Sequence, residues 1–477
     1  MRATGWHDNR DDGAQVYVTR VQLTDIKGFS GSRAVDLKLP GRGGWMVLAG
    51  RNGSGKSSLL QTVALALAGP DAALRLNVDF TGWITRGAEH GDAAVDVLPD
   101  PETDPMTVPA SLPEPGEEIR LRLAWRTVQL PGAEDDWPHR PSVVMDHWPD
   151  PALTPIAFSG PWMPEVPGWF CAGYGPFRRL TGPIHRAYNS HVPVPAPIET
   201  LFHENATLAE SVSWVLDLHY RSLQEYSDAR RSEGRPDLPA TLLLSTVMGL
   251  LDDGLLPHQY RLNGVSPDGL LVSLRGSDES FPLREMSDGF RTVAALVLDI
   301  IRQIHAAYGR LQTERSGSGR VAVLQPGVVL IDEIDAHLHV TWQRRIGDWL
   351  REHFPNIQFI VTTHSPYVCQ AADEGALVRL PGPEEDEPPA VVDEDLYRRV
   401  VYGGGDDAVL SELFGLDTPY SSRAERHRQR LVALERKVYA GTALPEEVSE
   451  YKELSRLLTS SVQSRVAEVA ARLETEQ

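Results

Sequence analysis

The sequence lacks the features typical of secreted and membrane-spanning proteins. Its 477 residues include only two cysteines, Cys171 and Cys369, which excludes a disulfide framework, and neither lies in a CxxC pair that could bind a metal. We expect both to be buried free thiols. No stretch approaches the roughly 18 uninterrupted apolar residues that cross a bilayer, and the opening MRATGWHDNRDD is polar and acidic. The sequence therefore predicts a cytoplasmic protein with no membrane partner.

Positive charge is also scarce. The chain has 46 Lys and Arg against 66 Asp and Glu, a net charge of -20, which argues against a protein whose whole surface coats nucleic acid. Local basic strips are not excluded, although we interpret each of them first as a solvated face. The residues concerned are Arg178, Arg179, Arg230, Arg231, Arg235, Arg423, Arg426, Arg428 and Arg430.

Apolar patterning indicates alternating strands and helices. A pair of strands is expected between Val16 and Leu39, and a strand at WMVLAG is followed by a glycine-rich turn and the helix KSSLLQTVALALAG. Proline recurs between residues 95 and 170, which excludes long helices there. Further on, YRLNGVSPDGLLVSLRG predicts a hairpin, and GVVLID and IQFIVTTHS predict buried strands. The tail after residue 406 has the charge alternation of amphipathic helices.

The segment GRNGSGKS matches the phosphate-binding pattern G-x-x-x-x-G-K-[ST] in its required context, after a predicted strand and before a predicted helix. Its glycines allow backbone N–H groups to turn inward around phosphates, and the helix N-terminus favours an anion. We expect Lys56 to bridge the terminal phosphates and Ser57 to ligate Mg²⁺. The predicted nucleotide-binding residues are Gly50, Arg51, Asn52, Gly53, Ser54, Gly55, Lys56, Ser57 and Ser58.

The segment VVLIDEID supplies acidic residues that complement this loop. Its apolar strand ends at Asp332, the predicted metal ligand, and at Glu333, the candidate base that orients an attacking water. A buried strand that ends in solvated acids would explain the two residues taken alone. The phosphate-binding loop elsewhere in the chain favours the catalytic interpretation.

Two further segments carry residues that could contact the phosphates of a nucleotide. LREMSDGFRT places Ser287 and Gly289 at the start of a long apolar helix, where a hydroxyl and backbone N–H groups can face an anion. IVTTHSP ends a predicted strand with His364, which could bond a γ-phosphate or the attacking water. Each segment alone would be interpreted structurally, as a helix cap and as a core histidine.

In their order along the chain, GRNGSGKS, MSDGF, VVLIDEIDAHLH and TTHSP resemble the Walker A, signature, Walker B with D-loop, and H-loop of ABC-type ATPases. The opening IKGF and the phrase DEIDAHLH are similar to soluble SMC/RecF-like and "AAA family" ABC ATPases. The resemblance implies an α/β P-loop NTPase with an ABC-ATPase-like core, a mixed sheet flanked by helices. It also implies ATP and Mg²⁺ as cofactors and ATP hydrolysis with Lys56, Glu333 and His364 as catalytic residues.

The same resemblance implies a homodimer or a higher homo-oligomer that forms through an ATP-sandwich interface. Ser287 and Gly289 of one copy would contact the nucleotide held by Lys56 and Asp332 of another, so ATP should drive dimerisation. The sequence departs from the family pattern in reading MSDGF instead of LSGGQ and in having Val340 where many relatives have proline. It does not place the Q-loop glutamine.

The histidines of the D-loop and H-loop raise one alternative. His337, His339 and His364 could together suggest a metal cluster, although the D-loop interpretation is preferred.

The motifs divide the chain into four parts. We expect an N-terminal ATPase half-lobe at 16–95, a Pro-rich and helical insert at 96–282, a C-terminal half-lobe at 283–405 and a helical appendage at 406–477. The prolines of the insert exclude the long coiled coil that SMC-type repair ATPases carry at this place.

Two phrases in the insert narrow the biology. GYGPFRRLTG and ETLFHENATLAESVSWVLDLHY are similar to phrases of prokaryotic defence ATPases of the Septu and retron-associated type. This resemblance implies a nucleotide-sensing switch in an antiviral complex, with a separately encoded nuclease or toxin as the effector partner.

Three other functions stay open at this stage. A RecF-like DNA repair ATPase that binds DNA is the main alternative, and a transporter subunit fits less well. A nuclease activity of the chain itself is disfavoured, because its sole D-x-D after His364, at Asp393 and Asp395, opens a predicted helix.

Overall fold

The computed structural model describes residues 17–99, 117–128, 142–146, 157, 160–163, 169–180, 197–231, 238–257, 259–315, 320–416 and 418–458. The chain divides into two compact units, Met1–Ala408 and Val409–Gln477. Most of the Pro-rich interval and the end of GYGPFRRLTG lie outside the described residues.

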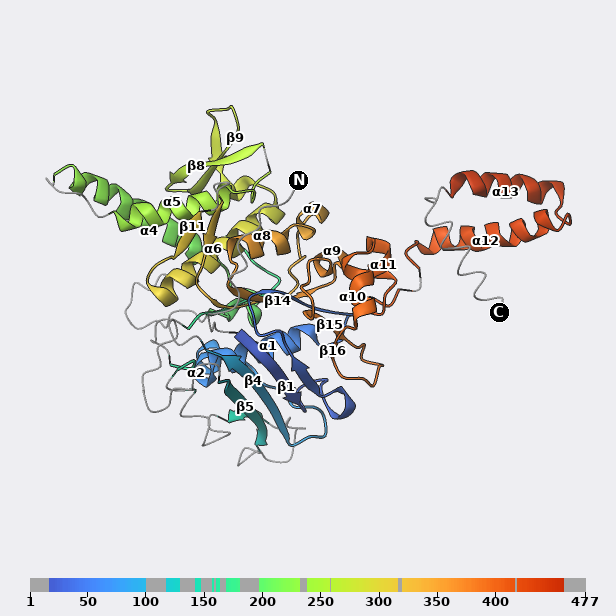
Figure 1. Ribbon diagram of the computed structural model, residues 1–477, viewed down its shortest axis with the longest axis horizontal. Helices are drawn as coiled ribbons and strands as arrows, with labels where there is room; N and C mark the ends of the chain where they lie inside the picture. The colour runs from blue at the N-terminus through green and yellow to red at the C-terminus, as the bar shows by residue number, and fades with distance from the viewer. Residues whose placement is uncertain are drawn as a thin grey trace, which may run out of the picture. The chain divides into compact units, whose positions relative to one another are not determined.

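A six-stranded sheet lies at the centre of the first unit (Figure 1). Its order is β16-β15-β3-β14-β13-β7, and all neighbours are parallel except β15 and β16. The inner strands β3, β14 and β13 are buried along almost their whole length because both faces of a parallel sheet are covered. The strands are β3 (Gly44–Gly50), β7 (Cys171–Tyr174), β13 (Gly327–Ile331), β14 (Ile357–Thr363), β15 (Leu377–Leu380) and β16 (Ala390–Val391).

A second, antiparallel sheet of order β2-β1-β4-β5-β6 belongs to the same unit. Helix α1 (Lys56–Ala68) lies between the two sheets and is buried along most of its length, so one hydrophobic core joins residues of both sheets and this helix. The helix ends at Gly69, and α2 (Pro70–Leu76) follows immediately. The strands are β1 (Tyr17–Thr24), β2 (Val35–Lys38), β4 (His90–Leu98), β5 (Ile119–Val128) and β6 (Ser142–Asp146).

The remaining elements of this unit cover the central sheet and extend from it. Helices α4 (Ala209–Ala229) and α5 (Pro239–Asp252) pack side by side, and α4 also packs on α6 (Asp288–Tyr308) (Figure 1). Short strands form a three-stranded antiparallel sheet of β8 (Tyr260–Ser266), β9 (Gly269–Leu274) and β10 (Ser280–Pro282), in which β8 and β9 are the predicted hairpin. A separate two-stranded sheet contains β11 (Thr313–Arg315) and β12 (Val321–Val323). The other helices are α7 (Val340–Gln343), α8 (Ile346–His353), α9 (Pro366–Cys369), α10 (Glu394–Val401) and α11 (Gly405–Val409), with 3₁₀ turns η1 (Gly31–Arg33), η3 (Glu199–Leu201) and η4 (Leu283–Glu285).

The second unit contains a helical hairpin of α12 (Ser422–Tyr439) and α13 (Pro445–Leu457). Arg430 donates two hydrogen bonds to the carboxylate of Glu450 across this hairpin, at 2.9 and 2.7 Å, and Lys437 pairs with Glu447 at 2.5 Å. Ion pairs therefore connect the two helices, as the charge alternation of the tail suggests.

The predicted strands, helices and hairpin in the described residues are confirmed, and so is the fold class: a P-loop NTPase with an ABC-ATPase-like mixed sheet flanked by helices. The interval 96–282 does more than separate the half-lobes. It supplies β5 and β6 to the antiparallel sheet and β7 to the central sheet. Its described helices α4 and α5 have 21 and 14 residues.

Among the described residues, no single helix is long and apolar enough to cross a membrane. Helices α1 and α2 taken together have the length and apolar composition of a membrane-spanning segment, but the chain bends by 116° between them.

Candidate nucleotide site

Three neighbouring parallel strands, β3, β14 and β13, end at the same edge of the central sheet. The loop that leads to Lys56 follows β3, Asp332 and Glu333 follow β13, and His364 follows β14. Ligands of open α/β sheets bind at the carboxyl ends of the strands. The structure therefore brings the four predicted catalytic and metal-binding side chains to one edge, where a nucleotide site is expected.

The loop from Gly50 to Ser57, hereafter the P-loop, has a backbone that requires glycine. Gly53 and Gly55 have φ values of 79° and 95°, in the left-handed region that side chains disfavour. A Cβ at Gly50 would lie 2.4 Å from the carbonyl oxygen of Leu380, so this position also has no room for a side chain. The glycines thus form a narrow backbone cradle that leads into the N-terminus of α1.

Two side chains of the P-loop fit a bound anion. The Oγ of Ser54 is buried and has no hydrogen-bond partner among the described residues, which leaves a donor for a ligand. The Nζ of Lys56, a residue only 6% exposed, donates to the carbonyl oxygens of Gly50 and Arg51 at 2.8 and 3.0 Å. This buried ammonium, the glycine cradle and the helix N-terminus together suit the phosphates of a nucleotide.

The electrostatic field at Lys56 connects the P-loop to the acidic residues. Burial lowers the pKa of the Lys56 ammonium, and the carboxylates of Asp332, Glu333 and Asp335 act in the opposite direction. The carboxylates after β13 are therefore close enough to the P-loop to stabilise the charged form of Lys56. Ligand phosphates near this ammonium would favour its charged form further.

The segment 332–335, hereafter the Walker B turn, is held by Thr362 of β14. The Thr362 hydroxyl donates to Oδ1 of Asp332 at 2.5 Å and accepts from the backbone N–H of Glu333 at 2.7 Å. Asp332 is 6% exposed, so its carboxylate is oriented within a shielded environment. Glu333 has a φ of 45°, a left-handed conformation that is uncommon for a residue with a side chain.

His364 lies at the end of β14, next to the same turn. Asp335 accepts hydrogen bonds from the Thr363 hydroxyl and from the backbone N–H of His364, the latter at 3.2 Å. Partial burial and the Lys56 ammonium lower the pKa of the His364 imidazole, and the carboxylates of Asp335, Glu333 and Asp332 oppose this shift. A neutral imidazole can donate from one ring nitrogen and accept at the other.

The signature residues Ser287 and Gly289 lie at the N-terminus of α6. Ser287 is the N-cap residue and, within the described part of the chain, its hydroxyl makes no capping hydrogen bond. A Cβ at Gly289 would lie 2.9 Å from the carbonyl oxygen of His337, so glycine permits close packing against the D-loop. The N-terminus of α6, which is expected to face an anion, thus packs against the D-loop at His337.

The alternative histidine cluster does not form. No group of three or more His, Cys, Asp or Glu side chains in the described ranges is arranged to hold a metal ion. His339 instead caps α7, where its Nδ1 accepts from the backbone N–H of Thr341 at 3.3 Å. The predicted metal ligands Ser57 and Asp332 lie at the start of α1 and directly after β13.

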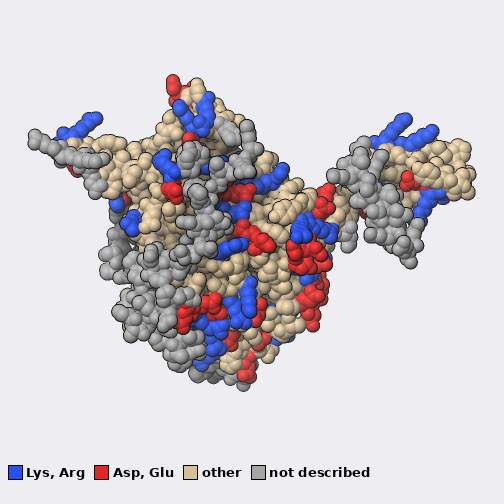
Figure 2. Space-filling model, viewed as in Figure 1, with Lys and Arg blue, Asp and Glu red and all other residues tan. Residues whose placement is uncertain are grey.

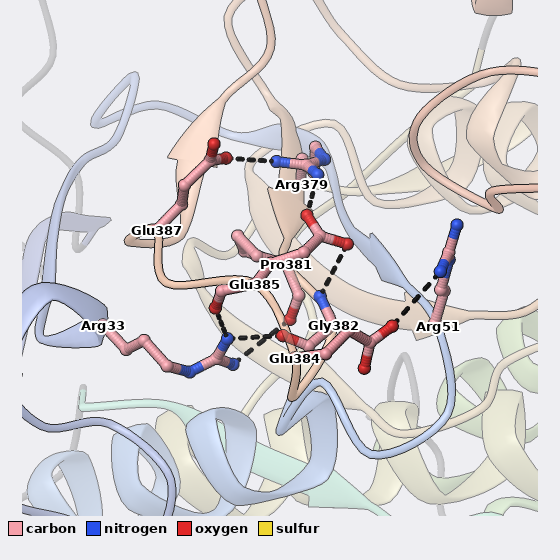
Figure 3. Close-up of polar contacts among 8 residues, drawn as sticks. All are labelled: Arg33, Arg51, Arg379, Pro381, Gly382, Glu384, Glu385 and Glu387. Carbon is pink, nitrogen blue, oxygen red and sulfur yellow. Dashed lines mark hydrogen bonds and ion pairs between the residues drawn. The ribbon is translucent and has the colours of Figure 1, made fainter.

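An acidic loop at residues 381–387, PGPEEDE, borders the P-loop (Figure 3). Arg33 binds its backbone through the carbonyl oxygens of Pro381, Gly382 and Glu385. Glu384 of this loop forms an ion pair with Arg51 at 3.2 Å. Both side chains are largely exposed, so this ion pair contributes only about 0–1 kcal/mol. It holds the predicted nucleotide-binding residue Arg51 toward the acidic loop.

Arg178 lies outside the four sequence motifs but contacts the Walker B turn. The sequence suggests a solvated basic strip that includes Arg178, but this residue is 3% exposed and cannot contact DNA in the described conformation, whereas its neighbour Arg179 is exposed. Its partners in the Walker B turn are backbone carbonyls, and a contact to a backbone group leaves no residue pattern in the sequence.

Over the face drawn in Figure 2, described acidic and basic side chains are interspersed, and acidic ones gather where Figure 1 draws α10 and β16.

Gly55 gives a direct test of the P-loop packing. Replacing it with alanine is expected to destabilise the protein by about 1–3 kcal/mol, because the new Cβ would lie 2.6 Å from Cζ of Phe29 at a φ of 95°. Gly53→Ala is the matched control, with a similar φ but only an ordinary contact of 3.7 Å to Pro383. Thermal unfolding should give a lower midpoint for Gly55→Ala. Equal midpoints would show that Phe29 does not constrain the loop.

Parts of the chain are similar to known proteins. A family described as "AAA domain, putative AbiEii toxin, Type IV TA system" matches residues 248–370, which contain the signature, Walker B and H-loop segments. The "Septu protein PtuA" of Bacillus mycoides (strain KBAB4) is 24% identical over 378 residues, 79% of this chain and 42% of that protein. The "Retron Ec83 probable ATPase" of Escherichia coli is 43% identical over 94 residues, 20% of this chain and 16% of that protein.

Among known structures, the SMC head domain from Thermotoga maritima has a TM-score of 0.38 and 15% identity, covering 79% of this chain and 98% of that one. The chain spans less than half of the length of the Septu relative and about a sixth of the retron relative. The motifs and the sheet order give the chain a P-loop NTPase fold with an ABC-ATPase-like core, and parts of the chain are similar in sequence to Septu PtuA and to the retron ATPase.

Proposed function

We propose that the chain binds and hydrolyses ATP at the carboxyl edge of the central sheet. The observation that carries this proposal is the convergence of Lys56, Asp332, Glu333 and His364 after three adjacent parallel strands. In this proposal the P-loop amides and Lys56 hold the phosphates, and Glu333 orients the attacking water. His364 bonds the terminal phosphate or that water.

Ser57 and Asp332 would hold Mg²⁺ in this site. When bound, the ion neutralises phosphate charge and makes the terminal phosphorus easier to attack. Hydroxyl and carboxylate oxygens are the ligands that Mg²⁺ prefers, and Mg²⁺ keeps several waters alongside them, so a single carboxylate fits the expected donor set.

We further propose that two chains close head to head, with Ser287 and Gly289 of each chain facing the nucleotide of the other. Two features of α6 support this. Its 21 residues give a full helix dipole behind the signature, and among the described contacts the Ser287 hydroxyl is not used as a cap. Both features suit an anion delivered from outside the chain.

A complementation experiment tests the shared site. A Lys56→Ala chain and a Ser287→Arg chain are each expected to be inactive, whereas their mixture should recover activity, since a mixed dimer contains one site with both defects and one site with neither. At equal concentrations about half of the dimers are mixed, and each has one intact site, so about a quarter of the wild-type rate is expected if sites act independently. No recovery, with both chains still folded, would contradict completion in trans.

We propose that this ATPase is the nucleotide-sensing switch of an antiviral defence complex, controlling a separately encoded nuclease or toxin. The likeness to Septu PtuA and to the retron ATPase supports this role. Expression with the genes beside its own should protect cells from phage, and Lys56→Ala should remove the protection. If the Lys56→Ala variant still protects the cells, ATP binding by this chain does not control the effector and the proposal is wrong.

A further inference from the structure

Arg178 is a buried arginine in the segment that follows β7. One terminal nitrogen of its guanidinium donates to the carbonyl oxygens of Gly175 and Asp332 at 2.9 and 3.0 Å. The other donates to those of Glu333 and Ile334 at 3.1 and 3.3 Å. One side chain from the segment after β7, the strand that pairs with β13, thus holds three consecutive backbone carbonyls of the Walker B turn.

The chemistry of this contact requires a guanidinium. Its donors are fixed in one plane, so it can bridge several carbonyls at once, whereas a lysine ammonium acts as a point charge. Burial lowers the pKa of Arg178 to about 10, while Asp332, Asp335 and Glu333 act in the opposite direction. The group therefore carries its charge at neutral pH, and these carboxylates compensate it through space.

The turn held by Arg178 has an unusual backbone. Glu333 has a φ of 45°, and such a conformation persists only where the surroundings determine it. Both backbone groups of Glu333 are bonded to side chains: its N–H to the Thr362 hydroxyl at 2.7 Å and its carbonyl to Arg178. These two contacts fix the direction in which the Glu333 side chain leaves the turn.

Strand β7, which precedes the segment that carries Arg178, is anchored to the signature helix α6. The Tyr174 hydroxyl at the end of β7 donates to Asp299 of α6 at 3.0 Å, and Asp299 accepts from Arg302 at 2.8 Å. Arg302 also pairs with Glu210 of α4 at 3.3 Å. The backbone carbonyl of Tyr174 accepts from the N–H of Asp332 at 2.7 Å. The support for Arg178 is therefore a rigid, largely buried network.

We propose that Arg178 is a positioning residue for hydrolysis: its guanidinium fixes the backbone of the Walker B turn so that the Glu333 carboxylate faces the attacking water. Arg178 touches neither substrate nor metal in this arrangement, and it acts through Glu333. The inference rests on the proposed ATPase function and adds a residue outside the four motifs that the sequence identifies.

The inference predicts a loss of turnover without a matching loss of ATP binding. Arg178→Ala should lower kcat about 100-fold, the usual range for a misplaced general base, and Arg178→Lys about 10-fold because charge alone is kept. The dissociation constant of ATP should stay within about threefold, since the P-loop is unchanged. Arg179→Ala is the matched control, an exposed neighbour expected to keep the wild-type rate.

Chemical rescue distinguishes positioning from charge. Millimolar guanidinium should restore part of the kcat of Arg178→Ala, whereas methylammonium at the same concentration should not, because only the planar fork can bridge the carbonyls. Arg178 variants that turn over at the wild-type rate would overturn the inference, and so would equal rescue by the two cations. If neither variant binds ATP, Arg178 supports the whole site and the inference is also wrong. A wild-type chain without turnover would instead remove the proposed ATPase function.

Discussion

Replacing Lys56 with alanine is expected to weaken ATP binding by about 100-fold or more, the effect of removing a charge-assisted contact to phosphates from a shielded site. The Lys56 ammonium is buried beside the glycine cradle, and its pKa responds to the carboxylates of the Walker B turn. Equilibrium binding of a fluorescent ATP analogue, with Mg²⁺ present, measures the loss.

Lys27→Ala is the matched control for this experiment. Lys27 is also partly buried, but its ammonium lies over the ring of Trp83, 4.6 Å from the centroid, and outside the P-loop. The control should bind ATP with the wild-type dissociation constant. If Lys56→Ala binds as tightly as the wild-type chain while circular dichroism shows both to be folded, the cradle is not the nucleotide site.

Replacing Glu333 with glutamine is expected to give the opposite pattern, with ATP bound but not turned over. The amide keeps the size of the carboxylate and leaves the backbone contacts to Thr362 and Arg178 in place. It removes the charge that orients and deprotonates water, so kcat should fall about 100-fold or more. Since the closed dimer would then no longer be opened by hydrolysis, size-exclusion chromatography with ATP should show a stable dimer.

Glu314→Gln, an exposed position on β11, controls for loss of a carboxylate elsewhere. It should hydrolyse ATP at the wild-type rate and form no trapped dimer. Normal hydrolysis by Glu333→Gln would mean that another group activates the water. Asp335 would be the next candidate, since it is the other carboxylate of the Walker B turn besides the predicted metal ligand Asp332.

The strands and helices that carry the motifs could be predicted because their signals are local. The runs WMVLAG and GVVLID are short, apolar and followed by glycine or acidic residues, and period and flanking residues suffice to place them. The strands of a parallel sheet end at one carboxyl edge. This arrangement explains why Lys56, Asp332 and His364 lie at the same edge.

The role of Arg178 could not be predicted because it depends on pairing between distant segments. The four-residue strand CAGY joins the central sheet beside β13, and neither its length nor its composition specifies that partner. Arginine is rarely buried, so the pair Arg178 and Arg179 suggests a solvated surface. Only the tertiary structure separates them into one buried and one exposed residue.

The pairing of β3 also determines how the chain can fold. Gly44 lies opposite Gln358 of β14, and Gly50 lies opposite Leu380 of β15, so both neighbours of the strand before the P-loop come from the other end of the first unit. During synthesis the P-loop strand has no sheet partner until the ribosome has made β14. Such non-local pairing is slow and leaves apolar strands exposed meanwhile. A nascent chain truncated before β14 should therefore bind chaperones and lack the nucleotide cradle altogether.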